Sequence, residues 1–154
     1  MKYVIGVTGN IATGKSTVLD ILRELGARVI DADSVTRRIM RRGEPAFDQI
    51  VAAFGQEIVG PSGELDRGAL GRRVFGDAAA LRTLERIVHP LTLAEIRREI
   101  DASAAGVVVV EAIKLIESGF ADEVCDSLWV VDAPAEAQLA RLMERRGMSR
   151  EEAL

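Results

Sequence analysis

A glycine-rich stretch near the N-terminus has the residue types most suited to chemistry. Residues 9–16 read Gly-Asn-Ile-Ala-Thr-Gly-Lys-Ser. Glycines let successive backbone amides wrap around phosphate oxygens, while the lysine can contact the β and γ phosphates of a nucleotide and the serine can ligate Mg²⁺. We expect Lys15 to be an exposed loop cation. The predicted ATP site consists of Gly9, Asn10, Ile11, Ala12, Thr13, Gly14, Lys15, Ser16 and Thr17.

Acidic residues follow two short apolar runs and could complete this site. Alternate residues of an extended segment project to one side, so both acids of Asp31-Ala32-Asp33 can face the phosphate loop. Asp33 can then deprotonate an acceptor hydroxyl, or it can simply cap the next helix, as can Ser34. Glu111 can orient Mg²⁺ or be an ordinary loop residue. The predicted metal ligands are Ser16, Asp31 and Glu111.

Basic residues near the C-terminus could contact the transferred phosphoryl group. Arg141 and Arg145 share one face of a predicted helix, although arginines on such a face can also be merely solvated. His89 precedes Pro90 and is either a helix-end residue or a ligand contact. Because the chain has one histidine and one cysteine, a zinc site is disfavoured.

The elements that must position these residues alternate between strands and helices. Val18, Leu22 and Leu25 have helical spacing until Gly26 provides a stop. Alternation of this kind predicts an α/β fold of the phosphate-loop class, with a parallel sheet flanked by helices in three layers. The predicted strands are residues 2–8, 28–30, 107–110 and 128–131.

The sequence pattern in the middle of the chain instead predicts consecutive helices. A helix begins after Pro45, a turn follows at residues 60–63, and a later helix should kink or end at His89-Pro90. We therefore expect an inserted helical domain at residues 34–103. Residues 1–33 and 104–154 would form the nucleotide-binding core.

Composition limits the possible partners. The chain of 154 residues is 48% hydrophobic, which suits one globular protein, and its net charge of −4 argues against nucleic acid as a partner. No apolar run approaches the roughly 20 residues that a membrane span needs. We expect a cytoplasmic monomer or weak homo-oligomer that uses ATP and Mg²⁺ and has a small-molecule substrate.

Several motifs together make the chain similar to a known family. They include residues 5–17, Val29-Ile-Asp-Ala-Asp33, Asp66-Arg67, Leu84-Glu-Arg-Ile-Val-His-Pro90 and Val130-Val-Asp-Ala-Pro134. The chain resembles the dephospho-coenzyme A kinases, in which ATP phosphorylates the ribose 3′-hydroxyl of dephospho-coenzyme A. The resemblance implies that residues 34–103 bind the coenzyme and that an arginine-bearing lid follows the fourth strand.

The motifs and the resemblance together suggest roles for the candidate residues. Asp33 would be the base, and Lys15 and Arg141 would act with it in catalysis. Arg145 would join the ATP contacts. We expect the acceptor to contact Thr8, Asp33, Arg67 and His89, together with Lys114, whose role the resemblance does not explain.

Two features depart from the family pattern. Residues 111–116 read Glu-Ala-Ile-Lys-Leu-Ile, where the family usually has Asp-Ile-Pro-Leu-Leu and an aromatic residue, so Lys114 has no family counterpart. Members of the family are also longer. Because Ser149-Arg150-Glu151-Glu152 has the spacing of a capping box just before the last residue, we expect this chain to be incomplete and to turn over poorly.

Other functions remain as alternatives. A GTPase would need Asn-Lys-x-Asp and Asp-x-x-Gly elements, and neither occurs. Another small-molecule kinase, of the shikimate or nucleoside type, differs only in the acceptor domain. A non-catalytic nucleotide-binding module is the third possibility.

Overall fold

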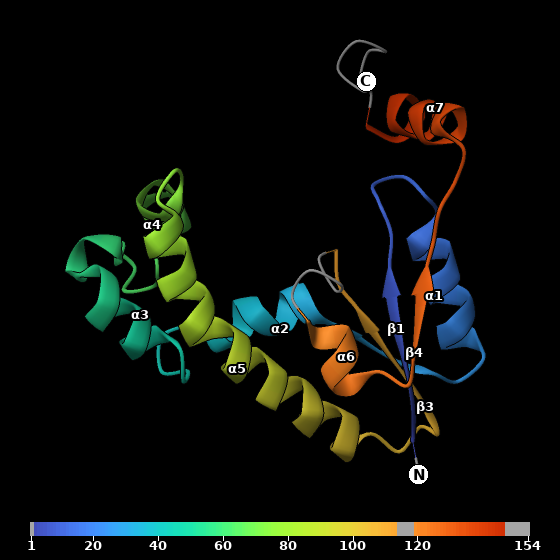
Figure 1. Ribbon diagram of the computed structural model, residues 1–154, viewed down its shortest axis with the longest axis horizontal. Coiled ribbons are helices and arrows are strands. Elements are labelled where there is room, and N and C mark those ends of the chain that lie inside the picture. Colours follow the sequence, from blue (N-terminus) through green and yellow to red (C-terminus); the bar gives the residue numbers. More distant parts are fainter. Residues whose placement is uncertain (1, 114–118, 147–154) are drawn as a thin grey trace. The chain divides into compact units, whose positions relative to one another are not determined.

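The computed structural model describes residues 2–113 and 119–146 (Figure 1). The chain divides into two compact units. Unit 1 consists of Met1–Asp31 and Ala102–Leu154, and unit 2 of Ala32–Asp101. We describe each unit by itself.

Unit 1 is built on a parallel β-sheet. Within the described residues the strand order is β2-β3-β1-β4, so β1 lies between two neighbours (Figure 1). The α/β parallel-sheet prediction is confirmed, with strand ends shifted by a residue or so. The strands are β1 (Tyr3–Thr8), β2 (Arg28–Asp31), β3 (Val107–Glu111) and β4 (Ser127–Val130).

The register of the strands brings their carboxyl ends to one edge. Glu111 is the register partner of both Val7 in β1 and Asp31 in β2, and Thr8 pairs with Val130. Parallel open sheets bind ligands at this edge. The segment that follows β1 therefore begins beside Glu111 at the end of β3, and Asp31 at the end of β2 lies one strand further along the same edge.

A small apolar core fixes the first helix against the sheet. Ile5, Val7 and Val109 pack with Leu19 of α1 (Lys15–Glu24). Gly26, with φ of 90°, ends this helix as predicted, because its amide donates to the Arg23 carbonyl at 2.9 Å while the next amide reaches back to Leu22. The start of α1 is thus held at the edge where β1 ends.

Two further helices and a hydrogen bond to the Asp126 carboxylate complete unit 1. They are α6 (Phe120–Val124) and α7 (Ala135–Arg146). The backbone amide of Val4 donates to Asp126 Oδ2 at 2.7 Å, which ties the start of β1 to the start of β4. Burial, with a smaller contribution from Asp126, raises the pKa of the neighbouring Cys125 thiol to about 11, so this thiol is protonated at neutral pH.

Unit 2 is helical in the residues described. Its elements are α2 (Ala32–Ile39), α3 (Phe47–Phe54), a 3₁₀ turn (Gln56–Ile58), α4 (Arg67–Val74) and α5 (Ala78–Ala102), with one isolated antiparallel bridge between Val59 and Leu65. The predicted helix after Pro45 is confirmed by α3. No helix among the described residues is long and apolar enough to cross a membrane.

The helix α2 is attached to α5 along one side. Arg38 Nη2 lies 2.6 Å from Glu99 Oε1 and 3.0 Å from Glu95 Oε1, while the hydroxyls of Thr36 and Thr92 are 3.2 Å apart. The hydrogen bond to Glu99 is the main reason that the pKa of Arg38 is raised. These polar contacts fix the rotation of α2 about its own axis.

The prediction was that a helix kinks or ends at His89-Pro90. The helix does not end there, because α5 continues through Pro90 to Ala102. Proline removes one helical hydrogen bond, but buried apolar residues continue on both sides of it, among them Val88, Leu93 and Ile96. Packing of this stripe outweighs the local cost. Asp77 begins α5 by accepting hydrogen bonds from the Ala79 and Ala80 amides.

Candidate nucleotide and phosphoryl-transfer site

The segment between β1 and α1 has the backbone of an anion-binding loop. Gly14 precedes α1 in the left-handed conformation, with φ of 99°, and Ala12 has φ of 60°, which is unusual for a residue with a side chain. Such strain is found at ligand sites where the surrounding structure imposes it. The loop leads directly into the N-terminus of α1, so its backbone amides lie beside the end of the helix where the dipole favours negative charge.

Gly9 allows this loop to pass close to another strand end. A Cβ at Gly9 would clash with the backbone carbonyl oxygen of Val131 and would lie 3.2 Å from Thr13 Oγ1. The backbone there has φ of 157°. Sequence reasoning predicted glycine for its freedom, but this contact with Val131 has no local sequence signal, because it depends on β4 lying beside β1.

Two buried threonine hydroxyls hold the loop and the segment after β3. Thr13 Oγ1 donates to the Asn10 carbonyl at 2.9 Å across the loop, and Thr8 Oγ1 donates to the Ile113 carbonyl at 3.0 Å. Both threonines are 5% exposed. In this arrangement Thr8 positions the chain after β3, and its predicted contact with an acceptor stays a prediction.

Lys15 is paired with an acid. Its Nζ lies 2.7 Å from Glu111 Oε1, and the two side chains are only 14% and 19% exposed. The expectation of an exposed loop cation is therefore wrong: Lys15 is the first residue of α1 and its side chain reaches to the end of β3. The pairing arises because the register places Glu111 beside Val7, immediately before the loop.

The oxygen donors at this edge suit a magnesium ion that is shared with phosphate. Asp31 and Glu111 are register partners, and Ser16 is exposed at the start of α1. Among the described residues no group of three or more His, Cys, Asp or Glu side chains could hold a metal by itself. Mg²⁺ commonly takes one or two protein oxygens and completes its shell with substrate phosphates and water, so this sparse donor set fits it.

Arg141 reaches the loop from α7. Its Nη1 donates to the Ala12 carbonyl at 2.9 Å, and a Cβ placed on Gly14 would be 3.5 Å from the same nitrogen. The solvated-surface alternative is thereby excluded for Arg141. A guanidinium bound to one carbonyl of a phosphate loop retains further N–H donors for an anion.

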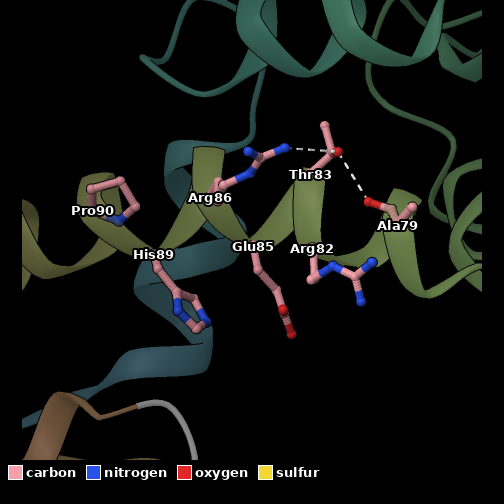
Figure 2. A pocket seen from close by; sticks show the side chains of 7 residues that line it. All are labelled: Ala79, Arg82, Thr83, Glu85, Arg86, His89 and Pro90. Carbon is pink, nitrogen blue, oxygen red and sulfur yellow. Dashed lines mark hydrogen bonds between the residues drawn. The ribbon is translucent and has the colours of Figure 1, made fainter.

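The predicted acceptor residues of the described chain lie mainly in unit 2. Asp33 is exposed in the first turn of α2, and Arg67 is the first residue of α4. His89 is half-buried in α5, on the lining of a cavity of about 680 Å³ that also includes Arg82 and Glu85. Figure 2 shows these three side chains on one side of α5, with Arg86 and Thr83 on the other.

Some predicted residues lie outside what the structure describes. Lys114 belongs to residues 114–118, and the capping box at 149–152 follows the last described residue. The backbone of Arg145 is part of α7, but its side chain is not among those described. Their roles stay predictions.

Comparison with known proteins assigns the family. The sequence model with the description "Dephospho-CoA kinase" matches residues 3–154. The dephospho-CoA kinase of Symbiobacterium thermophilum is 49% identical over 153 residues, which cover 97% of this chain. The chain belongs to the dephospho-CoA kinase family.

Solved structures agree with the assignment. The structure of TT1252 from Thermus thermophilus matches 99% of this chain with a TM-score of 0.81 and 37% identity. Dephospho-CoA kinase from Campylobacter jejuni matches 99% of the chain with a TM-score of 0.67 and 30% identity. The chain spans 64% of the length of the Symbiobacterium protein and 76% and 77% of the two solved chains.

The close approach at Gly9 generates the first prediction. We expect Gly9→Ala to weaken ATP binding by roughly 10-fold or more, about 1.4 kcal/mol, because the added Cβ must displace either the loop or the Val131 carbonyl. Gly106→Ala is the matched control, since a Cβ there has nothing within 4 Å. Calorimetric titration with ATP measures both. Unchanged ATP affinity in a folded Gly9→Ala protein would contradict the proposed loop geometry.

Proposed function

We propose that the protein carrying this chain is an ATP-dependent kinase that phosphorylates the ribose 3′-hydroxyl of dephospho-coenzyme A and releases coenzyme A and ADP. This would be the last step of coenzyme A synthesis. The observation that carries the proposal is the family match over residues 3–154. The phosphate loop, its lysine and the nearby acids of unit 1 support it independently.

The proposed reaction is an in-line transfer of the γ-phosphoryl group. The 3′-oxygen of the ribose forms a bond to the γ phosphorus, while the bond from that phosphorus to the oxygen bridging it to the β phosphate breaks. ADP leaves with the electron pair of that bond. The proton of the hydroxyl passes to the Asp33 carboxylate. Because the transition state carries its charge on phosphoryl oxygens, positioning and electrostatic stabilisation supply most of the catalysis.

Lys15 would change partner when ATP binds. In the structure its ammonium is neutralised by Glu111 at 2.7 Å. The β and γ phosphates present more negative charge to the same ammonium than one carboxylate does, so they compete effectively for it. Exchange of partners would leave Lys15 on the phosphates and free the Glu111 carboxylate at the same edge of the sheet.

A magnesium ion would neutralise charge on the β and γ phosphates. Its protein ligands would be Ser16, through the hydroxyl, and Asp31 or Glu111, through carboxylate oxygens. The register pairing of Asp31 with Glu111 supports this choice, because it keeps two candidate oxygen donors at adjacent strand ends.

Arg141 would stabilise the transferring phosphoryl group. Its contact with the Ala12 carbonyl supports this role, since the guanidinium already lies at the phosphate loop. Phosphoryl-transfer enzymes gain large rate factors from an arginine in this position. Arg145, one helical turn further along α7, would add a contact to ATP.

Unit 2 would bind the acceptor. Asp33, Arg67 and His89 are its proposed contacts in this unit, together with Thr8 and Lys114 from elsewhere in the chain. A substrate as long as dephospho-coenzyme A needs a second surface of this kind, whereas a small ring can be enclosed by a shorter segment. A cytoplasmic location and a monomeric or weakly associating state belong to the same proposal.

An acceptor panel tests the proposal. We expect ADP release that depends on dephospho-coenzyme A and exceeds by roughly 10²-fold the release with shikimate or a nucleoside, because only the long acceptor fills unit 2. A coupled ADP assay gives the rates, and ³¹P NMR of the product identifies the ribose 3′-oxygen as the new ester. Clear turnover of another acceptor without binding of dephospho-coenzyme A would favour the other kinase class. ATP binding without turnover of any acceptor would favour a non-catalytic module.

The Asp33→Asn substitution distinguishes the two possible roles of Asp33, catalytic base and helix cap. Asparagine caps helices as well as aspartate, so a capping role would survive this change, whereas proton removal would not. We expect kcat to fall by roughly 10²-fold or more, with ATP affinity and thermal midpoint nearly unchanged. Ser34→Ala is the control for local helix effects and should keep kcat. A normal kcat for Asp33→Asn would leave Asp33 with a structural role alone.

A further inference from the structure

A basic cavity lies on unit 2, and of its lining residues only Arg67 has been assigned a role above. Its volume is about 430 Å³, and its lining comes from the end of α2 and the two residues after it, from the Leu65 side of the Val59–Leu65 bridge and from the start of α4. We call it the arginine cradle. The lining residues are Arg37, Met40, Arg41, Glu64, Leu65 and Arg67.

The charge of the cradle contrasts with that of the chain. Three arginines and one glutamate line it, which leaves a formal excess of two positive charges, whereas the whole chain carries −4. The glutamate, Glu64, already accepts a hydrogen bond from the backbone amide of Arg42 at 3.0 Å. Within the part of the chain that the structure describes, the guanidinium groups of Arg41 and Arg67 have no ion-pair partner. The cradle is therefore suited to an anion.

The segments that form the cradle are held by their own hydrogen bonds. The Gly60 amide donates to the Glu64 carbonyl at 2.8 Å, and the Asp66 amide donates to the Ile58 carbonyl at 2.8 Å. Asp66 also caps α4, accepting from the Ala69 amide at 3.0 Å. Arg67 thus projects from a fixed backbone, and binding an anion there costs little ordering of the chain.

The spacing along α2 links the cradle to the proposed base. Asp33, Arg37 and Arg41 follow one another at intervals of four residues, and all three are exposed, while Ala32, Val35 and Ile39 are buried on the other side of the helix. Four residues correspond to about one helical turn, with a rise of about 6 Å. Arg37 therefore lies one turn beyond Asp33. Arg41 lies past the end of the helix, and it lines the same cavity as Arg37.

We propose that the arginine cradle binds the 5′-diphosphate of dephospho-coenzyme A; the inference rests on the function proposed above. The 3′-hydroxyl is on the ribose ring and the 5′-oxygen is on C5′, the carbon attached next to it, so the diphosphate begins about one helical turn from the hydroxyl that meets Asp33. Arg37 then meets the nearer phosphate, and Arg41 and Arg67 the farther one. Guanidinium groups bind phosphate oxygens with paired, charge-assisted hydrogen bonds.

The occupant differs from ATP. The phosphates of ATP belong to the loop of residues 9–16 in unit 1, whereas the cradle is formed entirely by unit 2. Because the loop already accounts for the phosphates of ATP, the guanidinium groups of the cradle would bind a second molecule that carries phosphate. Dephospho-coenzyme A is the reactant that has a diphosphate in addition to its hydroxyl.

Calorimetric titration with two acceptors tests the cradle. Dephospho-coenzyme A has the diphosphate, and adenosine has the same ribose and base without it. For the Arg41→Ala/Arg67→Ala double variant we expect Kd for dephospho-coenzyme A to rise roughly 10-fold or more, with the Kd values for adenosine and ATP unchanged. Arg41→Lys should retain part of the affinity. Arg72→Ala, on α4 but outside the cradle, is the matched control and should bind all three ligands normally.

The titration gives different results if the cradle proposal fails and if the proposed function fails. If the original protein binds dephospho-coenzyme A and the double variant binds it equally well, or weakens adenosine to the same degree, the cradle is wrong and the function stands. If Arg72→Ala lost as much affinity for dephospho-coenzyme A as the double variant, the effect would come from the overall positive charge and not from the cradle. This result would also contradict the proposal. If the original protein does not bind dephospho-coenzyme A, the cradle and the proposed function are both wrong. Equal thermal midpoints verify that the variants are folded.

Discussion

The close passage of the phosphate loop beside the end of β4 is the constraint on which the rest of unit 1 depends. Gly9 can approach the Val131 carbonyl only without a side chain, and this approach directs the loop toward the N-terminus of α1. Ala12 and Gly14 then take left-handed conformations that an unsupported turn would avoid. The central position of β1 in the sheet, and the packing of Leu19 on that sheet, supply the support.

Both cations beside the loop have a partner before any nucleotide binds. Lys15 is held by Glu111, and Arg141 is held by the Ala12 carbonyl, so both cations that we assign to phosphate are already oriented toward the loop. A half-buried ammonium without its acid would be costly, which explains why an acid stands at the end of β3. Phosphate recognition in this account is an exchange of partners, and it needs little rearrangement of the chain.

Local sequence patterns predicted the strands, the phosphate loop and the end of α1, because each depends on neighbouring residues: an apolar run, a glycine spacing, a glycine stop. They could not predict the Lys15–Glu111 pair or the reach of Arg141, which depend on strand order and register. The prediction of a helix end at Pro90 also failed because of tertiary structure: the buried apolar residues of α5 continue past the proline. The cradle was also missed: Arg67 was predicted alone, and Arg37 and Arg41 join it only in the folded unit.

The central claim is that the loop recognises phosphates through its backbone and Lys15, and not the base or the sugar of the nucleotide. Calorimetric titration of one protein preparation with ATP and with AMP tests it most directly, because the two ligands share adenine and ribose and differ in the β and γ phosphates. The account predicts that ATP binds at least roughly 10²-fold more tightly than AMP, with the difference shrinking as salt rises. Equal affinities for ATP and AMP would contradict it.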